Sequence, residues 1–136
     1  MRNLHALCFA ALCTLCVAAF GQAGDWITVN DPKDLADIYT NKTIRSMGWT
    51  GYYRADGRGF IVAPGMKPAG RKWFVKGGDQ GCATLDSGAT TCFRFQRHKD
   101  NRNLIRITDL AKGTNFTATV EEGIPDFEPL EKAGRS

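Results

Sequence analysis

Histidine and cysteine are scarce in this 136-residue chain, and most of the cysteine lies near its start. The chain has two histidines and five cysteines, and three of the cysteines fall within the first 23 residues. Beyond residue 23, only His98, Cys82 and Cys92 remain, and no Cys-x-x-Cys spacing occurs. A zinc site needs about four nitrogen, sulfur or carboxylate ligands, and a thioredoxin-like redox motif needs the close cysteine spacing. We therefore predict no metal, no cofactor and no redox pair.

Catalytic patterns are also lacking. A Ser–His–Asp site requires a histidine base held beside its nucleophile, but His98 lies in the polar segment RHKDNRN and is interpreted as a solvated loop residue. Glu121 and Glu122 are adjacent, so on a strand they point to opposite faces and do not form a pair of carboxylates for glycoside chemistry. The sequence thus predicts no catalytic residue and favours a non-enzymatic protein. A hydrolase with an unrecognised site is an alternative.

A single long apolar run is present, and it lies at the N-terminus. Arg2 precedes the apolar run Leu4–Phe20, and small residues Gly21 and Ala23 follow it. This order is typical of a secretory signal peptide, and the run is short for a membrane span of about 20 apolar residues. We predict that residues 1–23 are a signal peptide cleaved after Ala23. The mature chain would then be periplasmic or secreted and would have no transmembrane segment.

The two cysteines that remain after cleavage flank the stretch GCATLDSGATTC. An even pair of cysteines in an exported chain is typical of a disulfide. A three-residue loop, Asp86-Ser87-Gly88, would set Leu85 opposite Ala89 and Cys82 opposite Cys92. These cysteines would form a non-hydrogen-bonded pair, whose Cα atoms lie roughly 4.5 Å apart, within reach of a disulfide.

The mature chain reads as one short helix followed by strands. Asp31 is a good N-cap and Pro32 suits the first helical position, so a helix over Pro32–Tyr39 is predicted. From Thr43 onward, apolar residues alternate with polar ones, and turn signals recur every 8–12 residues. We predict a single, mainly β domain over residues 24–127. It would be an antiparallel meander of about seven strands that forms a curled sheet or a small lipocalin-like barrel. Residues 128–136 are expected to be a disordered tail.

The register of two hairpins follows from keeping apolar residues on one face. A two-residue turn at Asp56-Gly57 would set Tyr53 opposite Phe60 and place Ile61 on the other face. After a loop at HKDNRN, Phe95 would lie opposite Ile105.

Positive charge is concentrated in the centre of the chain. Residues 54–106 hold eleven basic and four acidic residues. A basic face of this kind attracts anionic lipid or polysaccharide headgroups, and nucleic acid is not expected as a partner of an exported chain. The candidate basic surface consists of Lys72, Lys76, Arg94, Lys99, Arg102 and Arg106.

Aromatic residues on the inner faces of the strands would either fill the core or line an apolar pocket. Tyr52, Ile61 and Phe74 would lie on the outer faces, as a candidate apolar patch for a protein partner or beneath the N-terminal helix. The leading hypothesis is an exported, non-enzymatic binding module that associates with an anionic envelope component or an envelope protein. The alternative is a carrier of small apolar ligands. A large interior cavity would favour the carrier.

Two Asn-x-Thr patterns begin at Asn41 and Asn115, and they are acceptor sites only in a source that glycosylates such patterns.

Several motifs occur in an order that resembles a known family. These are LADIYTNKT, GYYRADGRG, GRKWFVKGGDQGC, TCFRFQR and EEGIP, spread over Leu35–Pro125. The chain resembles a family of small exported proteobacterial proteins of the rhizobial type, which is classed as a domain of unknown function. The resemblance implies a periplasmic or secreted location and brings no activity or catalytic residues with it.

Overall fold

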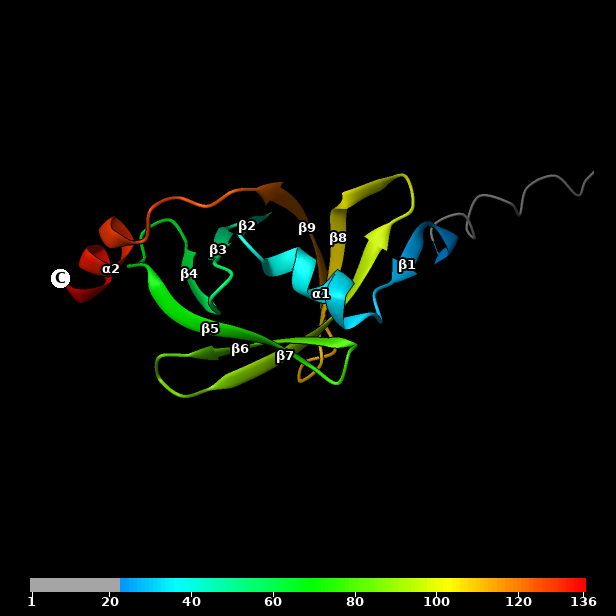
Figure 1. Ribbon diagram of the computed structural model, residues 1–136, viewed down its shortest axis with the longest axis horizontal. Helices are drawn as coiled ribbons and strands as arrows, with labels where there is room; N and C mark the ends of the chain where they lie inside the picture. Colours follow the sequence, from blue (N-terminus) through cyan, green and yellow to red (C-terminus); the bar gives the residue numbers. More distant parts are fainter. Residues whose placement is uncertain (1–22) are drawn as a thin grey trace, which may run out of the picture.

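The computed structural model describes residues 23–136 (Figure 1), so all but the last residue of the predicted signal peptide lies outside the described residues. The elements in chain order are η1 (Ala23–Asp25), β1 (Trp26–Thr28), α1 (Pro32–Tyr39), β2 (Lys42–Ser46), β3 (Trp49–Tyr53), β4 (Arg58–Val62), β5 (Ala69–Lys76), β6 (Gln80–Leu85), β7 (Thr90–His98), β8 (Asn101–Asp109), β9 (Asn115–Glu122) and α2 (Glu128–Arg135).

Eight of these strands form a closed antiparallel barrel. Each strand from β2 to β9 pairs with the next, and β9 pairs with β2, which completes the ring. β1 stands outside the ring and pairs with the C-terminal half of β7, beyond the stretch that β6 covers. Closure leaves no free strand edge within the ring. The predicted fold class is confirmed, although residues 23–136 hold nine strands rather than about seven.

Helix α1 closes one end of the barrel. It spans Pro32–Tyr39 as predicted, and the side chain of Asp31 caps it by accepting a hydrogen bond of 2.8 Å from the Lys33 amide. The helix packs against β2, β5 and β6. Leu35 and Ile38 are fully buried, and burial of each such side chain stabilises the fold by about 1.5–3 kcal/mol.

A buried arginine ties this helix to the barrel wall. Arg97, on the inner face of β7, is 7% exposed and lies 2.9 Å from the Asp34 carboxylate and 3.6 Å from that of Asp37. It also donates a hydrogen bond of 2.7 Å to the carbonyl oxygen of Arg102. The buried charge of Arg97 is therefore neutralised by carboxylates of α1, which fixes the helix over the barrel end.

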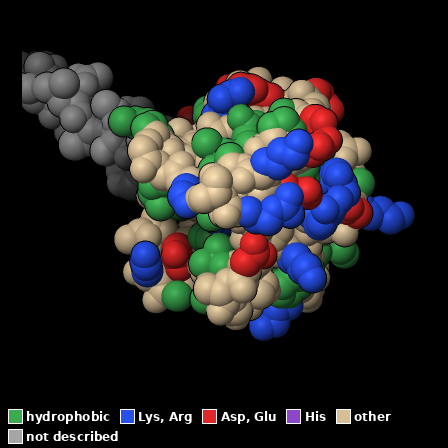
Figure 2. All heavy atoms as spheres, turned by 90° about the vertical axis from the view of Figure 1, so that its left-hand side faces the viewer, with side chains coloured by type: hydrophobic (Ala, Val, Ile, Leu, Met, Phe, Trp, Pro, Cys, Tyr) green, Lys and Arg blue, Asp and Glu red, His purple; other side chains and the backbone are tan. Residues whose placement is uncertain are grey.

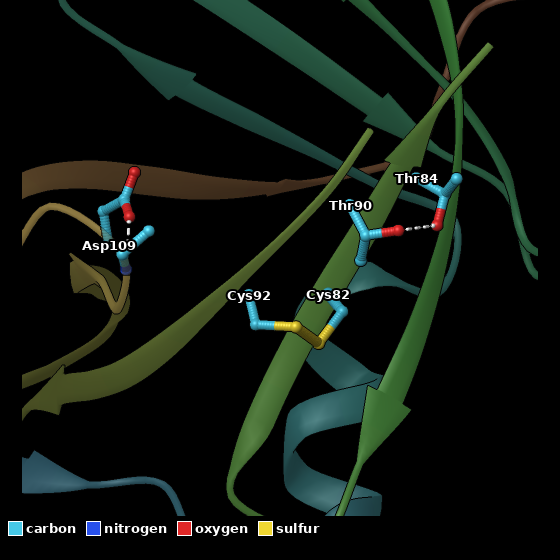
Figure 3. Close-up of a disulfide and its surroundings, with 6 residues drawn as sticks. Cys82, Thr84, Thr90, Cys92 and Asp109 are labelled. Carbon is cyan, nitrogen blue, oxygen red and sulfur yellow. Dashed lines mark hydrogen bonds between the residues drawn. A yellow bond between two sulfur atoms is a disulfide. The ribbon is translucent and has the colours of Figure 1, made fainter. Parts of the chain in front are cut away.

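The hairpin of β6 and β7 has the predicted register and the predicted disulfide (Figure 3). The Leu85 amide donates to the Ala89 carbonyl at 2.8 Å, and Gly88 adopts a positive φ of 97° in the three-residue loop. Cys82 and Cys92 face each other with Cα atoms 4.1 Å apart and are joined. One step nearer the turn, the hydroxyls of Thr84 and Thr90 are hydrogen-bonded at 2.9 Å.

The predicted register of the β3–β4 hairpin is wrong by one residue. Tyr52, not Tyr53, lies opposite Phe60. The loop has three residues, because the Arg54 amide bonds the Arg58 carbonyl and Gly57 takes a positive φ of 93°. A one-residue slip exchanges the two faces of β4, so Ile61 points into the barrel and Phe60 points out.

The register of β7 and β8 differs by two residues from the prediction. Phe95 lies opposite Ile107 rather than Ile105, because the two strands run on to His98 and Asn101 through an irregularity after Arg97. Most of the segment expected to be a loop is therefore strand. A shift of two residues keeps every side chain on its face, so the apolar interior survives the error.

The C-terminal residues were expected to be disordered, but residues 128–135 form helix α2. The cause lies just before the helix. Phe127 is 3% exposed and packs edge-on against Phe60, with ring centroids 5.2 Å apart. An ion pair of 3.0 Å joins Arg58 of β4 to Glu131 of α2. The helix thus covers the outer side of β4 and β5, at the end of the molecule that lies away from β1 (Figure 1).

Candidate functional site

The interior of the barrel holds a cavity of about 430 Å³ that is open to solvent on one side. This volume falls within the roughly 300–1,000 Å³ that is usual for sites of small molecules. Every strand of the ring contributes to its lining, as does α1, and aromatic and aliphatic side chains predominate. The lining residues are Tyr39, Ile44, Gly48, Trp49, Tyr53, Ile61, Ala63, Met66, Arg71, Ala83, Phe93, Phe95, Ile107 and Phe116.

The cavity is closed at the α1 end and leads toward solvent at the other. Tyr39, Ile44 and Phe95 are buried. Gly48, in the β2–β3 turn, and Met66, in the β4–β5 loop, are exposed, and Met66 retains 69% of its exposure. The mouth therefore lies between these two connections.

The connections at the open end of the barrel carry three exposed apolar side chains, of which Met66 lines the cavity. Met47 belongs to the β2–β3 turn and is 96% exposed. Met66 belongs to the β4–β5 loop, and Leu110, 37% exposed, begins the β8–β9 loop. All three connections lie at the barrel end opposite α1. We refer to Met47, Met66 and Leu110 below as the apolar rim.

Two buried tyrosines form part of the cavity wall. Tyr39 stacks on Trp73, with ring centroids 5.0 Å apart, and meets Tyr53 edge-on at 4.9 Å. Burial raises the pKa of both phenols, because a phenolate is poorly solvated there. Both hydroxyls are therefore neutral at ordinary pH and are able to donate hydrogen bonds.

Arg71 is the one charged residue among those that line the cavity. It lies on the inner face of β5, opposite Gly59 of β4 and Leu85 of β6. Its positive charge acts against the effect of burial and lowers the pKa of Tyr53. The interior therefore combines a large apolar surface with a single cation.

The residues of the predicted basic surface lie on the outside of the barrel, and four of the six are engaged with other side chains. Arg94 pairs with Asp79 at 3.7 Å, Lys99 with Asp25 at 3.1 Å and Arg102 with Asp34 at 3.1 Å. Arg106 lies over the Trp26 ring, 4.4 Å from its centroid.

Lys72 and Lys76 are exposed on β5 and make no ion pair within residues 23–136. Figure 2 shows the face that carries α2, where acidic side chains lie among the basic ones. Positive charge therefore does not dominate this face.

The ion pair between Asp25 and Lys99 also affects the lysine's titration. Asp25 raises the pKa of Lys99, mainly through a hydrogen bond and secondly through its negative charge.

The predicted outer apolar patch is wrong in one of its three members. Tyr52 is half-buried on the outside of β3 and Phe74 is 41% exposed on the outside of β5. Ile61 lines the cavity instead, because of the one-residue slip of β4. The neighbouring outer residue, Phe60, is covered by Phe127 and not by the N-terminal helix. The three residues therefore do not form one surface.

The remaining polar candidates have structural roles. His98 meets the Trp26 ring edge-on at 5.2 Å, and its Nδ1 accepts a hydrogen bond of 3.2 Å from the Asp100 amide. Asn41 accepts one of 3.0 Å from the Ala55 amide, whereas Asn115 is exposed at the start of β9. Across the part of the chain that the structure describes, no cluster of three His, Cys, Asp or Glu side chains is placed to hold a metal ion.

Sequence reasoning missed Arg71 and Ile61 as interior residues. A signal for Arg71 was present, because it alternates with Trp73 and Val75 on the inner face of β5. Because Arg71 is basic and lies near the start of β5, it is easily interpreted as an exposed residue at the end of the strand. Ile61 gave no such signal, because its face depended on the length of the preceding turn.

No protein-family model, curated protein or solved structure matches this chain, so the resemblance to exported proteobacterial proteins stays a prediction. Among residues 23–136, no helix has both the length and the apolar character needed to cross a membrane.

Proposed function

We propose that this protein is an exported, non-enzymatic carrier that holds a small apolar ligand inside its barrel. The observation that carries the proposal is the cavity of about 430 Å³ lined by aromatic and aliphatic side chains. Protein interiors are packed with few voids larger than a water molecule, and an eight-stranded barrel is narrow enough for side chains to fill. A space of this size within such a barrel therefore favours ligand binding over core packing.

The volume sets the size of the ligand. Water occupies roughly 30 Å³ per molecule in the liquid. At about the same volume for each non-hydrogen atom, 430 Å³ holds about 14 such atoms. A single chain of 10–12 carbons is of this size.

The apolar rim supports the same function. Met47 and Met66 are flexible, polarisable side chains that adapt to different apolar surfaces. Exposed apolar side chains in this position would contact an apolar ligand that enters and leaves between the β2–β3 turn and the β4–β5 loop. They are unexplained in a barrel that serves only as a rigid scaffold.

Export rests on the sequence of the N-terminal segment and agrees with the cysteine chemistry. Structural disulfides persist in oxidising compartments and are rare in the cytosol, so the Cys82–Cys92 bond supports the proposal of export. The leading sequence hypothesis placed binding on a basic outer surface. The ion pairs of Arg94, Lys99 and Arg102 weaken that alternative and favour the interior.

Titration with neutral n-alkanols tests the proposal. Trp49 lines the cavity, so its fluorescence should change on binding. Each added CH₂ group contributes about 0.8 kcal/mol, so Kd should fall about fourfold per carbon. The trend should level off near 10–12 carbons, where the cavity is full.

A matched pair of variants locates the site. Ala83 is 5% exposed and lines the cavity, whereas Ala89 is exposed on the same hairpin. Ala83→Phe should abolish decanol binding, and Ala89→Phe should leave it unchanged. Ala63→Phe, at the mouth, is a second blocking variant should Ala83→Phe be overpacked. The carrier function would be refuted if the wild-type protein bound no alkanol. It would also be refuted if Ala83→Phe and Ala63→Phe both bound decanol as tightly as the wild-type protein.

A further inference from the structure

The interior arginine identifies the chemical class of the ligand. We infer that the cavity binds an amphiphile with an apolar chain and an anionic head, and that Arg71 is the residue that pairs with this head. The inference rests on the proposed carrier function and adds the charge of the ligand to it.

Arg71 has no carboxylate partner within residues 23–136. It takes part in none of the ion pairs there, and its Nε is buried without a hydrogen-bond partner. Arg71 as a whole is half-buried, and a charged group that is partly withdrawn from water without an opposite charge is stabilised when a ligand supplies that charge. The guanidinium group is planar and forks toward two oxygens at once, which suits a carboxylate or a phosphate monoester.

Arg97 provides an internal comparison. It also lies on an inner face, on β7, and its Nε also lacks a partner. Its terminal nitrogens, however, reach Asp34 at 2.9 Å and the Arg102 carbonyl at 2.7 Å. The arginine that anchors α1 is thus supplied with an acid, and the arginine that lines the cavity is not. The charge of Arg97 is thus balanced within the fold, whereas Arg71 has the neutral Tyr53 hydroxyl beside it and no acid.

The surroundings of Arg71 favour a head group held by more than one donor. An added Cβ at Gly59 would lie 3.0 Å from the Tyr53 ring and 3.5 Å from Cγ of Arg71, so this glycine lets the tyrosine and the arginine stem approach each other. The Tyr53 hydroxyl is protonated, because burial raises its pKa. Arg71 and Tyr53 together offer a cation and a neutral donor on one side of an otherwise apolar cavity.

The ligand series follows from this geometry. Decanoate, decanol and decylamine share a chain that fits the cavity and differ in the charge of the head. Hydrogen bonds to charged groups contribute enough that decanoate should bind about 10- to 100-fold more tightly than decanol near pH 7.5. Decylamine should bind less tightly than decanol because its ammonium group is repelled by Arg71. Decyl phosphate, compared with decanoate, distinguishes a phosphate head from a carboxylate head.

Variants of Arg71 and its neighbour complete the test. Arg71→Met keeps the length of the side chain and should bring decanoate to the affinity of decanol. Arg71→Lys keeps the charge and should retain part of the preference. Lys72→Met removes a positive charge from the outer face of the same strand and should change nothing. Thermal unfolding confirms that each variant is folded, and the comparison of ligands in the wild-type protein needs no variant at all.

The outcomes separate the two proposals. If decanol binds and decanoate binds no more tightly, or if Arg71→Met keeps the preference for decanoate, the anionic ligand is refuted and the carrier function stands. If decanol does not bind to the wild-type protein, the carrier function itself fails. A preference for decanoate that Arg71→Met abolishes and Lys72→Met leaves intact supports both.

Discussion

Removal of the Cys82–Cys92 disulfide should lower the stability of the barrel without changing its cavity. The bond closes a short loop, since the two cysteines are separated by 10 positions. Constraint of a loop of about 11 residues in the unfolded chain stabilises the folded state by about 2.8 kcal/mol. The other contacts of the hairpin remain, including the Thr84–Thr90 hydrogen bond. We therefore expect the Cys82→Ala/Cys92→Ala variant to lose about 3 kcal/mol of unfolding free energy.

Urea unfolding measures this loss. With an m-value of about 2 kcal/mol/M, the midpoint should fall by about 1.4 M. The Thr84→Val/Thr90→Val variant is the matched control, because it alters the adjacent cross-strand pair (Figure 3) and should cost less than about 1 kcal/mol. Wild-type protein unfolded in the presence of a reductant should behave like the double cysteine variant.

Ligand binding distinguishes the two faces of the hairpin. The cysteines point outward, whereas Ala83 and Phe93, their neighbours in sequence, line the cavity. Decanol affinity should therefore be the same with and without the disulfide. Two reactive thiols in native wild-type protein, or a loss below about 1 kcal/mol, would refute the role of the bond. A loss of decanol binding would refute the separation of the faces.

Two further predictions concern alkaline pH and processing. Burial raises the pKa of Tyr39 and Tyr53, so above about pH 10 the unfolded chain loses phenolic protons that the folded chain keeps. The free energy of unfolding should then fall as pH rises above 10, and Tyr39→Phe should make this fall shallower, as measured by urea unfolding at a series of pH values. A slope that neither Tyr39→Phe nor Tyr53→Phe changes would contradict this assignment. The intact mass of the exported protein should correspond to a chain that starts at Gly24, and a full-length mass would contradict cleavage after Ala23.

Elements whose signals are local could be predicted from the sequence. The helix Pro32–Tyr39 follows from Asp31 as cap, and the β6–β7 register follows from the symmetry of a three-residue loop that ends in Gly88. The β3–β4 turn could not be settled in the same way, because Asp56-Gly57 fits a loop of two or of three residues. The face of β4 is decided by residues distant in sequence, since Phe127 covers Phe60.

The cavity exists only if the interior aromatic rings lie against the barrel wall and not at its centre. The alternation of residues along a strand predicts which side chains point inward, but not where their rings lie inside the barrel. A Cβ added at Gly51 would lie 2.6 Å from the Tyr53 ring, and one added at Gly81 would lie 2.6 Å from the Tyr39 hydroxyl. Neither glycine has a positive φ, so each is required for space and not for backbone conformation.

The rings therefore lie against the backbone of the wall, in room that the missing side chains leave. A larger residue at either glycine would force a tyrosine toward the centre of the barrel and fill it. The same set of inner aromatic residues would then form a solid core. The cavity thus depends on Tyr53 lying over Gly51 of its own strand and on Tyr39 of α1 lying against Gly81 of β6, and only the second pairing is brought together by the closed barrel.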